Sequence, residues 1–212
     1  MTKPTLESSA PNDRQSIRKK ILTKRKTLTS TFQTNEAKSL LSCLQNDIDI
    51  KKANHIALYL AVNGELDLQP FIHWCWQQQK QVYLPVVHPF SNGHLLFLRY
   101  DNTSTMVKNQ YHIEEPRLDI RHIKPIQELE VLLTPLVAFD NTGARIGMGG
   151  GYYDRTLANW HKNQHHQSKY NFSPIGIAYD FQQIAKVPCE HWDIPLPKII
   201  TPTQNINCHL GK

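Results

Sequence analysis

Residues 129–161 read LEVLLTPLVAFDNTGARIGMGGGYYDRTLANWH, and the pattern of this stretch decides the fold class. The apolar run over 129–133 predicts a buried strand, residues 134–150 a long loop, and residues 152–161 a helix. A fully apolar strand that leads through a loop into a helix is typical of α/β proteins, in which helices cover a parallel sheet.

The rest of the chain continues this alternation. Residues 101–125 are polar and interrupted by proline, so we expect a loop there. The whole pattern favours a mostly parallel sheet that is covered on both faces. The other predicted helices span 13–28, 30–45 and 70–79, and the other predicted strands span 56–61, 82–87, 95–100, 175–178 and 199–201.

Composition limits the class of protein. The chain has 212 residues, 40% of them hydrophobic and 20% charged, which fits one globular domain. No stretch approaches the roughly 20 apolar residues of a membrane helix, and residues 1–9 lack the apolar segment of a secretory signal. The four cysteines are far apart, which argues against a disulfide framework or a zinc site. We therefore expect a cytoplasmic protein without membrane contact, frayed over 1–12.

Glycine makes the loop after the strand at 129–133 a candidate phosphate site. Five of the nine glycines of the chain lie between Gly143 and Gly151. Glycines allow backbone N–H groups to approach an anion, and the N-terminus of the following helix favours negative charge. Arg145 can bind phosphate oxygens, and Asp154, in the first helical turn, can hold a cation that bridges phosphates. The loop matches neither GxGxxG nor a Walker motif.

A cluster of basic residues is the second chemical signal. Residues 14–26 contain seven basic residues and no acidic one, within a formal net charge of +6. Arg14, Arg18 and Arg25 form a stripe beside the apolar stripe of the same helix, so they can point into a cleft. Such a cluster attracts phosphate on a nucleic acid, a lipid or a nucleotide, and composition does not choose among these.

Several segments together resemble a known family. The stretch FDNTGARIGMGGGYYDR over 139–155 closely resembles the signature of the 5-formyltetrahydrofolate cyclo-ligase family. Four other segments also resemble segments of that family: RQSIRKKILTKRKTLT over 14–29, YLAVNGELDL over 59–68, GIAYDFQQ over 176–183 and VPCEHWDIPLPKIIT over 187–201. The resemblance implies a three-layer α/β/α sandwich, with a single cyclo-ligase-like domain over 13–212.

The resemblance also implies a reaction. Family members convert 5-formyltetrahydrofolate to 5,10-methenyltetrahydrofolate, with ATP as co-substrate, Mg²⁺ as cofactor, and ADP and phosphate as products. Phosphorylation turns the formyl oxygen into a good leaving group, and the neighbouring folate nitrogen then closes the ring. Such chemistry depends mainly on positioning and on charge neutralisation. The implied partners are a reduced folate and ATP, with no nucleic acid and no membrane, and we expect a monomer.

Carried over position by position, the resemblance implies three sets of site residues. The ATP-binding set is Arg14, Gln15, Ser16, Ile17, Arg18, Arg145, Ile146, Gly147, Met148, Gly149, Gly150, Gly151, Tyr152 and Tyr153. The folate-binding set is Arg18, Val62, Glu65, Asp67, Met148, Gly149, Gly150, Gly151 and Tyr152. The metal set is Asp154 and Asp193.

Structural roles compete with these assignments. The arginines of 14–18 can belong to a solvated helix face, Glu65 and Asp67 can cap the helix at Pro70, and the tyrosines can be core residues. Two other functions also remain open: another phosphate- or ATP-using enzyme on the same fold, and a basic RNA-binding module. The RNA-binding module requires stacking aromatics or a basic recognition helix, and neither is evident in the sequence.

Overall fold

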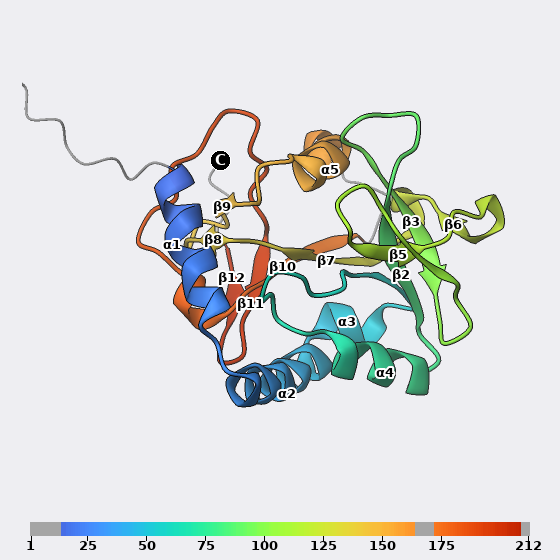
Figure 1. Ribbon diagram of the computed structural model, residues 1–212, viewed down its shortest axis with the longest axis horizontal. Helices are drawn as coiled ribbons and strands as arrows, with labels where there is room; N and C mark the ends of the chain where they lie inside the picture. Colours follow the sequence, from blue (N-terminus) through green and yellow to red (C-terminus); the bar gives the residue numbers. More distant parts are fainter. Residues whose placement is uncertain (1–13, 164–171, 209–212) are drawn as a thin grey trace, which may run out of the picture.

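The computed structural model describes residues 14–163 and 172–208 (Figure 1). The frayed segment predicted over 1–12 lies outside the described residues. None of the described helices is long and apolar enough to cross a membrane. The described helices are α1 (Arg14–Lys26), α2 (Ser30–Asn46), α3 (Ile48–Lys52), α4 (Gln69–Gln77) and α5 (Tyr152–Asn163), with short 3₁₀ helices at Ile120–His122, Ile126–Glu128 and Asp180–Gln182.

A mixed sheet forms the middle layer, with the strand order β12-β11-β10-β7-β1-β2-β3-β6. The four central pairings, from β11 to β2, are parallel, and β12, β3 and β6 add antiparallel pairings at the two edges. The prediction of a mostly parallel sheet is therefore confirmed. The strands are β1 (His55–Ala57), β2 (Gln81–Val87), β3 (Leu95–Tyr100), β6 (Ile123–Lys124), β7 (Val131–Pro135), β10 (Ser173–Ile177), β11 (Lys198–Ile200) and β12 (Asn205–Asn207).

Helices cover both faces of this sheet, as Figure 1 shows. On one face, α2, α3 and α4 bury Leu44, Ile50 and Ile72 against the central strands. On the other face, α5 buries Leu157, with Trp160 packed beside it. The structure is thus the expected three-layer α/β/α fold. Burial of such side chains is the main contribution that holds the layers together.

Helix α1 belongs to neither layer and lies across the carboxyl ends of the parallel strands (Figure 1). There Ile21 packs with Val137, Ala138 and Ile146 in a separate apolar cluster. The last three residues belong to the small hairpin of β8 (Ala138–Phe139) and β9 (Arg145–Ile146), or directly precede it. Since ligands of such sheets bind beyond the carboxyl ends of the strands, α1 borders the place where a site is expected.

Local capping explains where the helices on the first face begin. The Thr29 hydroxyl accepts the Phe32 amide at 3.2 Å and starts α2. Asp47 ends α2 and starts α3, because its Oδ1 accepts the amides of Asp49 and Ile50. Both arrangements satisfy helix N–H groups that would otherwise lack a partner.

Several predicted boundaries were wrong. The strand predicted over 56–61 ends at Ala57, although Leu58 still donates to the Tyr83 carbonyl at 3.0 Å. The strand predicted over 129–133 is shifted to β7. The predicted loop over 101–125 contains a hairpin of β4 (Met106–Lys108) and β5 (Glu114–Pro116), and the predicted loop over 134–150 contains β8 and β9. These strands are two or three residues long, too short to produce a periodic pattern. Helix α3 and strand β12 also escaped prediction because they are short.

Candidate functional site

The first turns of α1 place two arginines beside the glycine-rich loop. Arg14 binds both carboxylate oxygens of Asp193, with 3.0 Å between Nη2 and Oδ1. Arg18 donates from Nε to the Gly147 carbonyl at 2.7 Å. Both arginines are half-buried, so they do not lie on a fully solvated face of the helix. Gln15 and Ser16 are exposed, and Ile17 packs against the apolar cluster of α1.

Arg145 is almost completely buried, with 5% of its surface exposed. Its Nη2 donates to Asp154 Oδ1 at 2.8 Å, and its Nη1 donates to the Ile194 carbonyl. The Ile194 amide donates to the same oxygen of Asp154 at 3.3 Å. Burial lowers the pKa of Arg145, and the Asp154 carboxylate opposes that shift. Arg145 thus joins β9, the first turn of α5 and the segment that carries Asp193.

The loop between β9 and α5 is open to solvent and has the backbone of an anion cradle. Gly149 has φ +108°, a left-handed conformation, and a side chain there would meet no atom within 4 Å. Met148 is 52% exposed. Within the described part of the chain, the amides of 148–151 donate no hydrogen bond. Free amides in a left-handed glycine turn at a helix N-terminus are a binding arrangement for phosphate.

The two tyrosines at the start of α5 have different surroundings. Tyr153 packs against the core, and burial raises its pKa well above the ordinary value. The Tyr152 hydroxyl lies 2.7 Å from that of Tyr111, in the hairpin loop between β4 and β5, and the rings meet edge to face. Tyr153 is thus half-buried against the core, which is the role that competed with the site role for these tyrosines.

The loop after β1 carries the residues that the sequence assigns to folate. Glu65 is 8% exposed, and its Oε2 accepts the Val62 amide at 3.1 Å. Burial raises the pKa of Glu65. Asp67 is half-buried, and its Oδ1 accepts the amide of Gln69, the first residue of α4, at 2.9 Å. Asp67 thus satisfies the first amide of α4 from the position before the N-cap residue Leu68, and no hydrogen bond from the described residues reaches its second oxygen.

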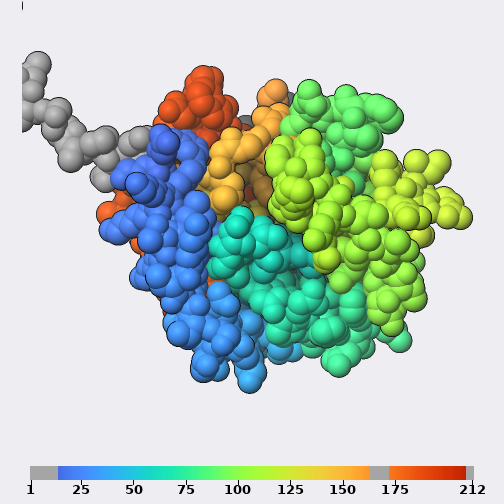
Figure 2. Space-filling model, in the orientation of Figure 1, coloured from blue at the N-terminus to red at the C-terminus, as the bar shows by residue number. Residues whose placement is uncertain are grey.

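These pieces adjoin on one face of the molecule. Figure 2 shows the blue surface of α1, the teal surface of the loop after β1 and the gold surface of the glycine-rich loop next to one another. Tyr153 lies near both halves, since Glu65 and Arg145 both influence the pKa of its hydroxyl. The predicted nucleotide residues and the predicted folate residues therefore border one region at the carboxyl ends of the strands.

The two carboxylates of the predicted metal set differ in their fit to Mg²⁺. The described residues contain no cluster of three or more His, Cys, Asp and Glu side chains that could hold a metal ion. Asp154 uses Oδ1 for Arg145 and Ile194, and no hydrogen bond from the described residues reaches its Oδ2. Asp193 has both oxygens on Arg14, and Oδ2 also accepts the Glu190 amide. Mg²⁺ commonly takes one or two carboxylates and completes its shell with phosphates and water. Asp154 fits that requirement, whereas Asp193 fits it only after it releases Arg14.

Two arginines near this region are not among the site residues predicted from the sequence. Arg155 donates to the carbonyls of Gly93 and Gly150 and so ties the glycine-rich loop to the β2–β3 turn. Arg25, on α1, is buried beside Glu65. Arg25 was detectable as the third member of the arginine stripe of α1. The contact of Arg155 depends on a turn 62 residues away in the chain, so no local pattern reveals it.

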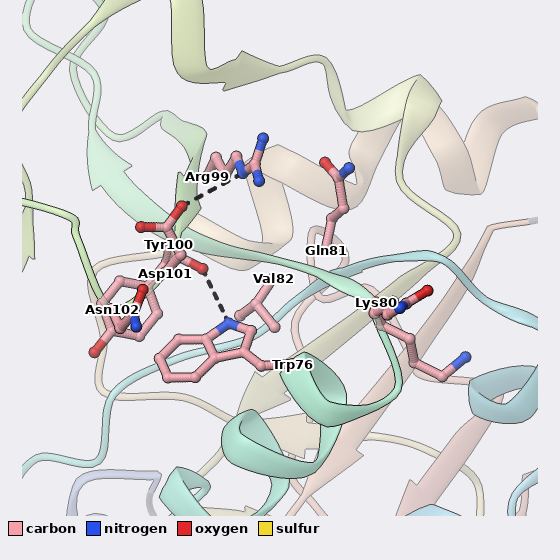
Figure 3. Close-up of a pocket in the computed structure, with 9 residues that line it drawn as sticks. Trp76, Lys80, Gln81, Val82, Arg99, Tyr100, Asp101 and Asn102 are labelled. Carbon is pink, nitrogen blue, oxygen red and sulfur yellow. Dashed lines mark hydrogen bonds and ion pairs between the residues drawn. The ribbon is translucent and has the colours of Figure 1, made fainter.

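The described part of the chain also has two cavities away from this region. One of about 280 Å³ lies between the start of β2 and the end of β3 (Figure 3). There the Trp76 indole N–H donates to the Tyr100 carbonyl at 3.2 Å, and Arg99 pairs with Asp101 at 3.6 Å. The other, of about 380 Å³, shares Arg99 and Asp101. Both lie at the amino-terminal edge of the parallel strands, opposite α1.

Comparisons with known proteins point to one family. Residues 10–202 match the sequence model of the 5-formyltetrahydrofolate cyclo-ligase family. The chain is 46% identical over 181 residues to the 5-formyltetrahydrofolate cyclo-ligase of Escherichia coli (strain K12), covering 85% of this chain and 96% of that protein. It is 46% identical over 187 residues to the protein of that name from Haemophilus influenzae, covering 88% of this chain and 96% of the relative. The NMR structure of Aquifex aeolicus 5,10-methenyltetrahydrofolate synthetase superposes with a TM-score of 0.77 at 27% identity, covering 94% of each chain.

Proposed function

The chain belongs to the 5-formyltetrahydrofolate cyclo-ligase family, and we propose that the region between α1, the glycine-rich loop and the loop after β1 is its active site. The protein is an ATP-dependent ligase of folate one-carbon metabolism that converts 5-formyltetrahydrofolate to 5,10-methenyltetrahydrofolate. The family match along most of the chain favours this activity over the two alternatives, another phosphate- or ATP-using enzyme on the same fold and a basic RNA-binding module.

One observation carries the assignment of the nucleotide site: the free amides of 148–151 lie between Arg18, on the Gly147 carbonyl, and the Arg145–Asp154 pair. Backbone amides and arginines bind phosphate oxygens and neutralise charge that develops during phosphoryl transfer. In this proposal, Gly147, Met148, Gly149, Gly150 and Gly151 surround the phosphates, with Ile146 as the buried anchor of the loop. Arg14 and Arg18 supply positive charge from α1, and Gln15, Ser16 and Ile17 border the nucleotide.

The proposed reaction has two steps. The formyl oxygen attacks the terminal phosphorus of ATP, and ADP leaves. The N10 nitrogen of the folate then attacks the formyl carbon, the carbon–oxygen bond breaks, and phosphate departs with the former formyl oxygen, while N10 loses its proton. Val62, Glu65 and Asp67 hold the folate, with carboxylate oxygens that accept its amino and imino hydrogens. Tyr152, at the mouth of the loop, lies between the two ligands, and no side chain acts as a nucleophile.

This mechanism predicts the fate of the formyl oxygen. If the formyl oxygen is phosphorylated, substrate labelled with ¹⁸O in the formyl group yields inorganic phosphate that carries the label, one labelled atom per turnover. Mass spectrometry of the released phosphate, with methenyl product measured by absorbance, provides the test. Methenyl product formed with the label recovered only in water would contradict phosphorylation of the formyl oxygen.

Asp154 is the residue that we propose to hold Mg²⁺, with the nucleotide phosphates as further ligands. The ion would neutralise phosphate charge and orient the transferred group. Asp193 holds Arg14 in place, and its oxygens are available to the metal only when that pair opens.

We expect Asp154→Asn to raise the Mg²⁺ concentration for half-maximal activity about tenfold, because a neutral amide is a much weaker magnesium ligand than a carboxylate. The amide oxygen still accepts from Arg145, so the fold is preserved. Metal titrations at saturating ATP give the measurement, with Asp193→Asn as the matched variant. That second change should raise the KM for ATP through Arg14 and shift the metal curve less. An unaltered titration curve for Asp154→Asn would remove this residue from the metal site.

The family assignment also supports a proposal about where the protein acts and in which oligomeric state. We expect the protein to act as a cytoplasmic monomer on small substrates, a reduced folate and ATP, without nucleic acid or membrane.

A further inference from the structure

Arg25 is the charged side chain whose burial the proposed mechanism leaves unexplained. It is 2% exposed, on the last turns of α1, the helix that carries Arg14 and Arg18 at its other end. Its Nη2 donates to the Leu136 carbonyl. Its Nε and Nη1 have no hydrogen-bond partner among the described residues. A buried guanidinium with unsatisfied donors is costly unless a nearby negative charge compensates it.

The compensating charge is Glu65. Nη1 of Arg25 lies 3.7 Å from Glu65 Oε1, and both side chains are buried. The loop that carries Glu65 packs directly on Arg25: a side chain at Gly64, where φ is +72°, would approach the Arg25 carbonyl oxygen to 2.9 Å and its Cβ to 3.0 Å. Position 64 therefore has to be glycine for the loop to approach α1 so closely.

Glu65 keeps one oxygen available. Oε2 accepts the Val62 amide, whereas no hydrogen bond from the described residues reaches Oε1, which faces Arg25 at a longer distance. The backbone of the same loop is fixed by two tyrosines, since the Tyr59 hydroxyl donates to the Leu66 carbonyl at 3.2 Å and the Tyr179 hydroxyl to the Glu65 carbonyl at 3.5 Å. A rigid, buried carboxylate with a free oxygen is suited to accept a hydrogen bond from a ligand.

We propose that Arg25 is a positioning residue for the folate substrate: it keeps Glu65 ionised and holds its loop so that Oε1 can accept N–H groups of the pterin ring. This inference rests on the proposed folate site. It gives α1 a second task, because the helix touches the nucleotide loop near Arg18 and the folate loop at Arg25. Seven residues of helix separate the two contacts, a length of about 10 Å.

Among the described residues, the positive charge beside the Glu65 carboxylate is that of Arg25. The groups that face the carboxylate are Arg25 on α1, Tyr59 after β1, Tyr153 on α5 and Tyr179 after β10. Burial raises the pKa of each of the three tyrosines, so they are neutral near pH 7. Burial also raises the pKa of Glu65, and Arg25 opposes that shift. Without Arg25 the pKa of Glu65 rises further, and the protonated carboxyl accepts poorly.

The test is the pH dependence of the two KM values in Arg25→Gln. We expect the KM for 5-formyltetrahydrofolate at neutral pH to rise about tenfold, while the KM for ATP changes less than about twofold. The folate KM should fall again as the pH is raised and Glu65 ionises, whereas the wild-type value stays flat. Arg25→Lys retains a positive charge and should recover most of the flat profile. Lys20→Gln, which removes a charge from the exposed side of α1, should behave as wild type.

The outcomes separate this inference from the site assignment. Glu65→Gln should raise the folate KM to a value that does not vary with pH; an unchanged folate KM would refute the folate site itself. If Glu65→Gln has that effect but Arg25→Gln raises both KM values equally, or without pH dependence, the role of Arg25 is overturned and the folate site stands. Should Arg25→Gln fail to fold, Arg25→Met decides, because it also removes the charge: a selective, pH-dependent rise in the folate KM supports the inference, and a rise in the ATP KM alone or no change in either KM overturns it.

Discussion

Arg145→Ala is expected to lower kcat/KM for ATP about a thousandfold, the size of loss seen when a preorganised donor to a developing anion is removed. Two effects add to each other. The positive charge behind the glycine-rich loop disappears, and the Asp154 carboxylate and the Ile194 carbonyl lose the group that joins them. The metal ligand and the loop are then no longer held in one arrangement.

Steady-state kinetics with ATP varied at saturating folate would measure this loss, and the Tm would show whether the protein remains folded. Arg145→Lys is the matched control, because it keeps the charge but lacks the planar guanidinium that donates to both Asp154 and Ile194. Its activity should lie between those of wild type and Arg145→Ala. If Arg145→Ala stays folded and retains wild-type kcat/KM, Arg145 does not belong to the nucleotide site.

Gly149→Ala should raise the KM for ATP at least about tenfold with little change in Tm. Gly149 has φ +108°, where an L-residue is strained by about 1–3 kcal/mol. An added methyl group meets no protein atom, so the strain is relieved by movement of the exposed loop rather than by unfolding. The amides of 148–151 then lose their common direction, and phosphate binding weakens.

Gly147→Ala provides the comparison for this prediction. Position 147 lies in the same loop, and a methyl group added there would also meet open space, but its φ is not in the left-handed region. The same substitution should therefore raise the ATP KM by less than about threefold. Equal effects at the two positions would show that steric contact with the ligand, rather than the backbone of Gly149, determines binding.

Much of the fold was predictable because the central strands are apolar runs between helices. Ile56, Leu132 and Ile175 are fully buried in three neighbouring strands, and the period of the surrounding sequence separates them from the helices. What escaped prediction depends on contacts between distant segments. Strand β12 is three residues long with exposed asparagines at both ends, and pairing with β11 makes it a strand.

The candidate site shows the same division. The glycine-rich loop and Arg145 were evident locally, since glycine, arginine and an acidic helix start occur within twelve residues. Arg25 and Arg155 act through partners about 40 and 60 residues away, Glu65 and Gly93. The pairing of Asp193 with Arg14 across 179 residues also could not be read from the sequence, although it decides which oxygens are left for a metal.

A crystal structure with a non-hydrolysable ATP analogue and Mg²⁺ would test the proposed nucleotide site directly. We expect the terminal phosphate on the amides of 148–151, with Arg18 and Arg145 beside it and the metal on Asp154. A nucleotide bound at the opposite edge of the sheet, in the cavity near Trp76, or at another place with the glycine-rich loop empty, would contradict it.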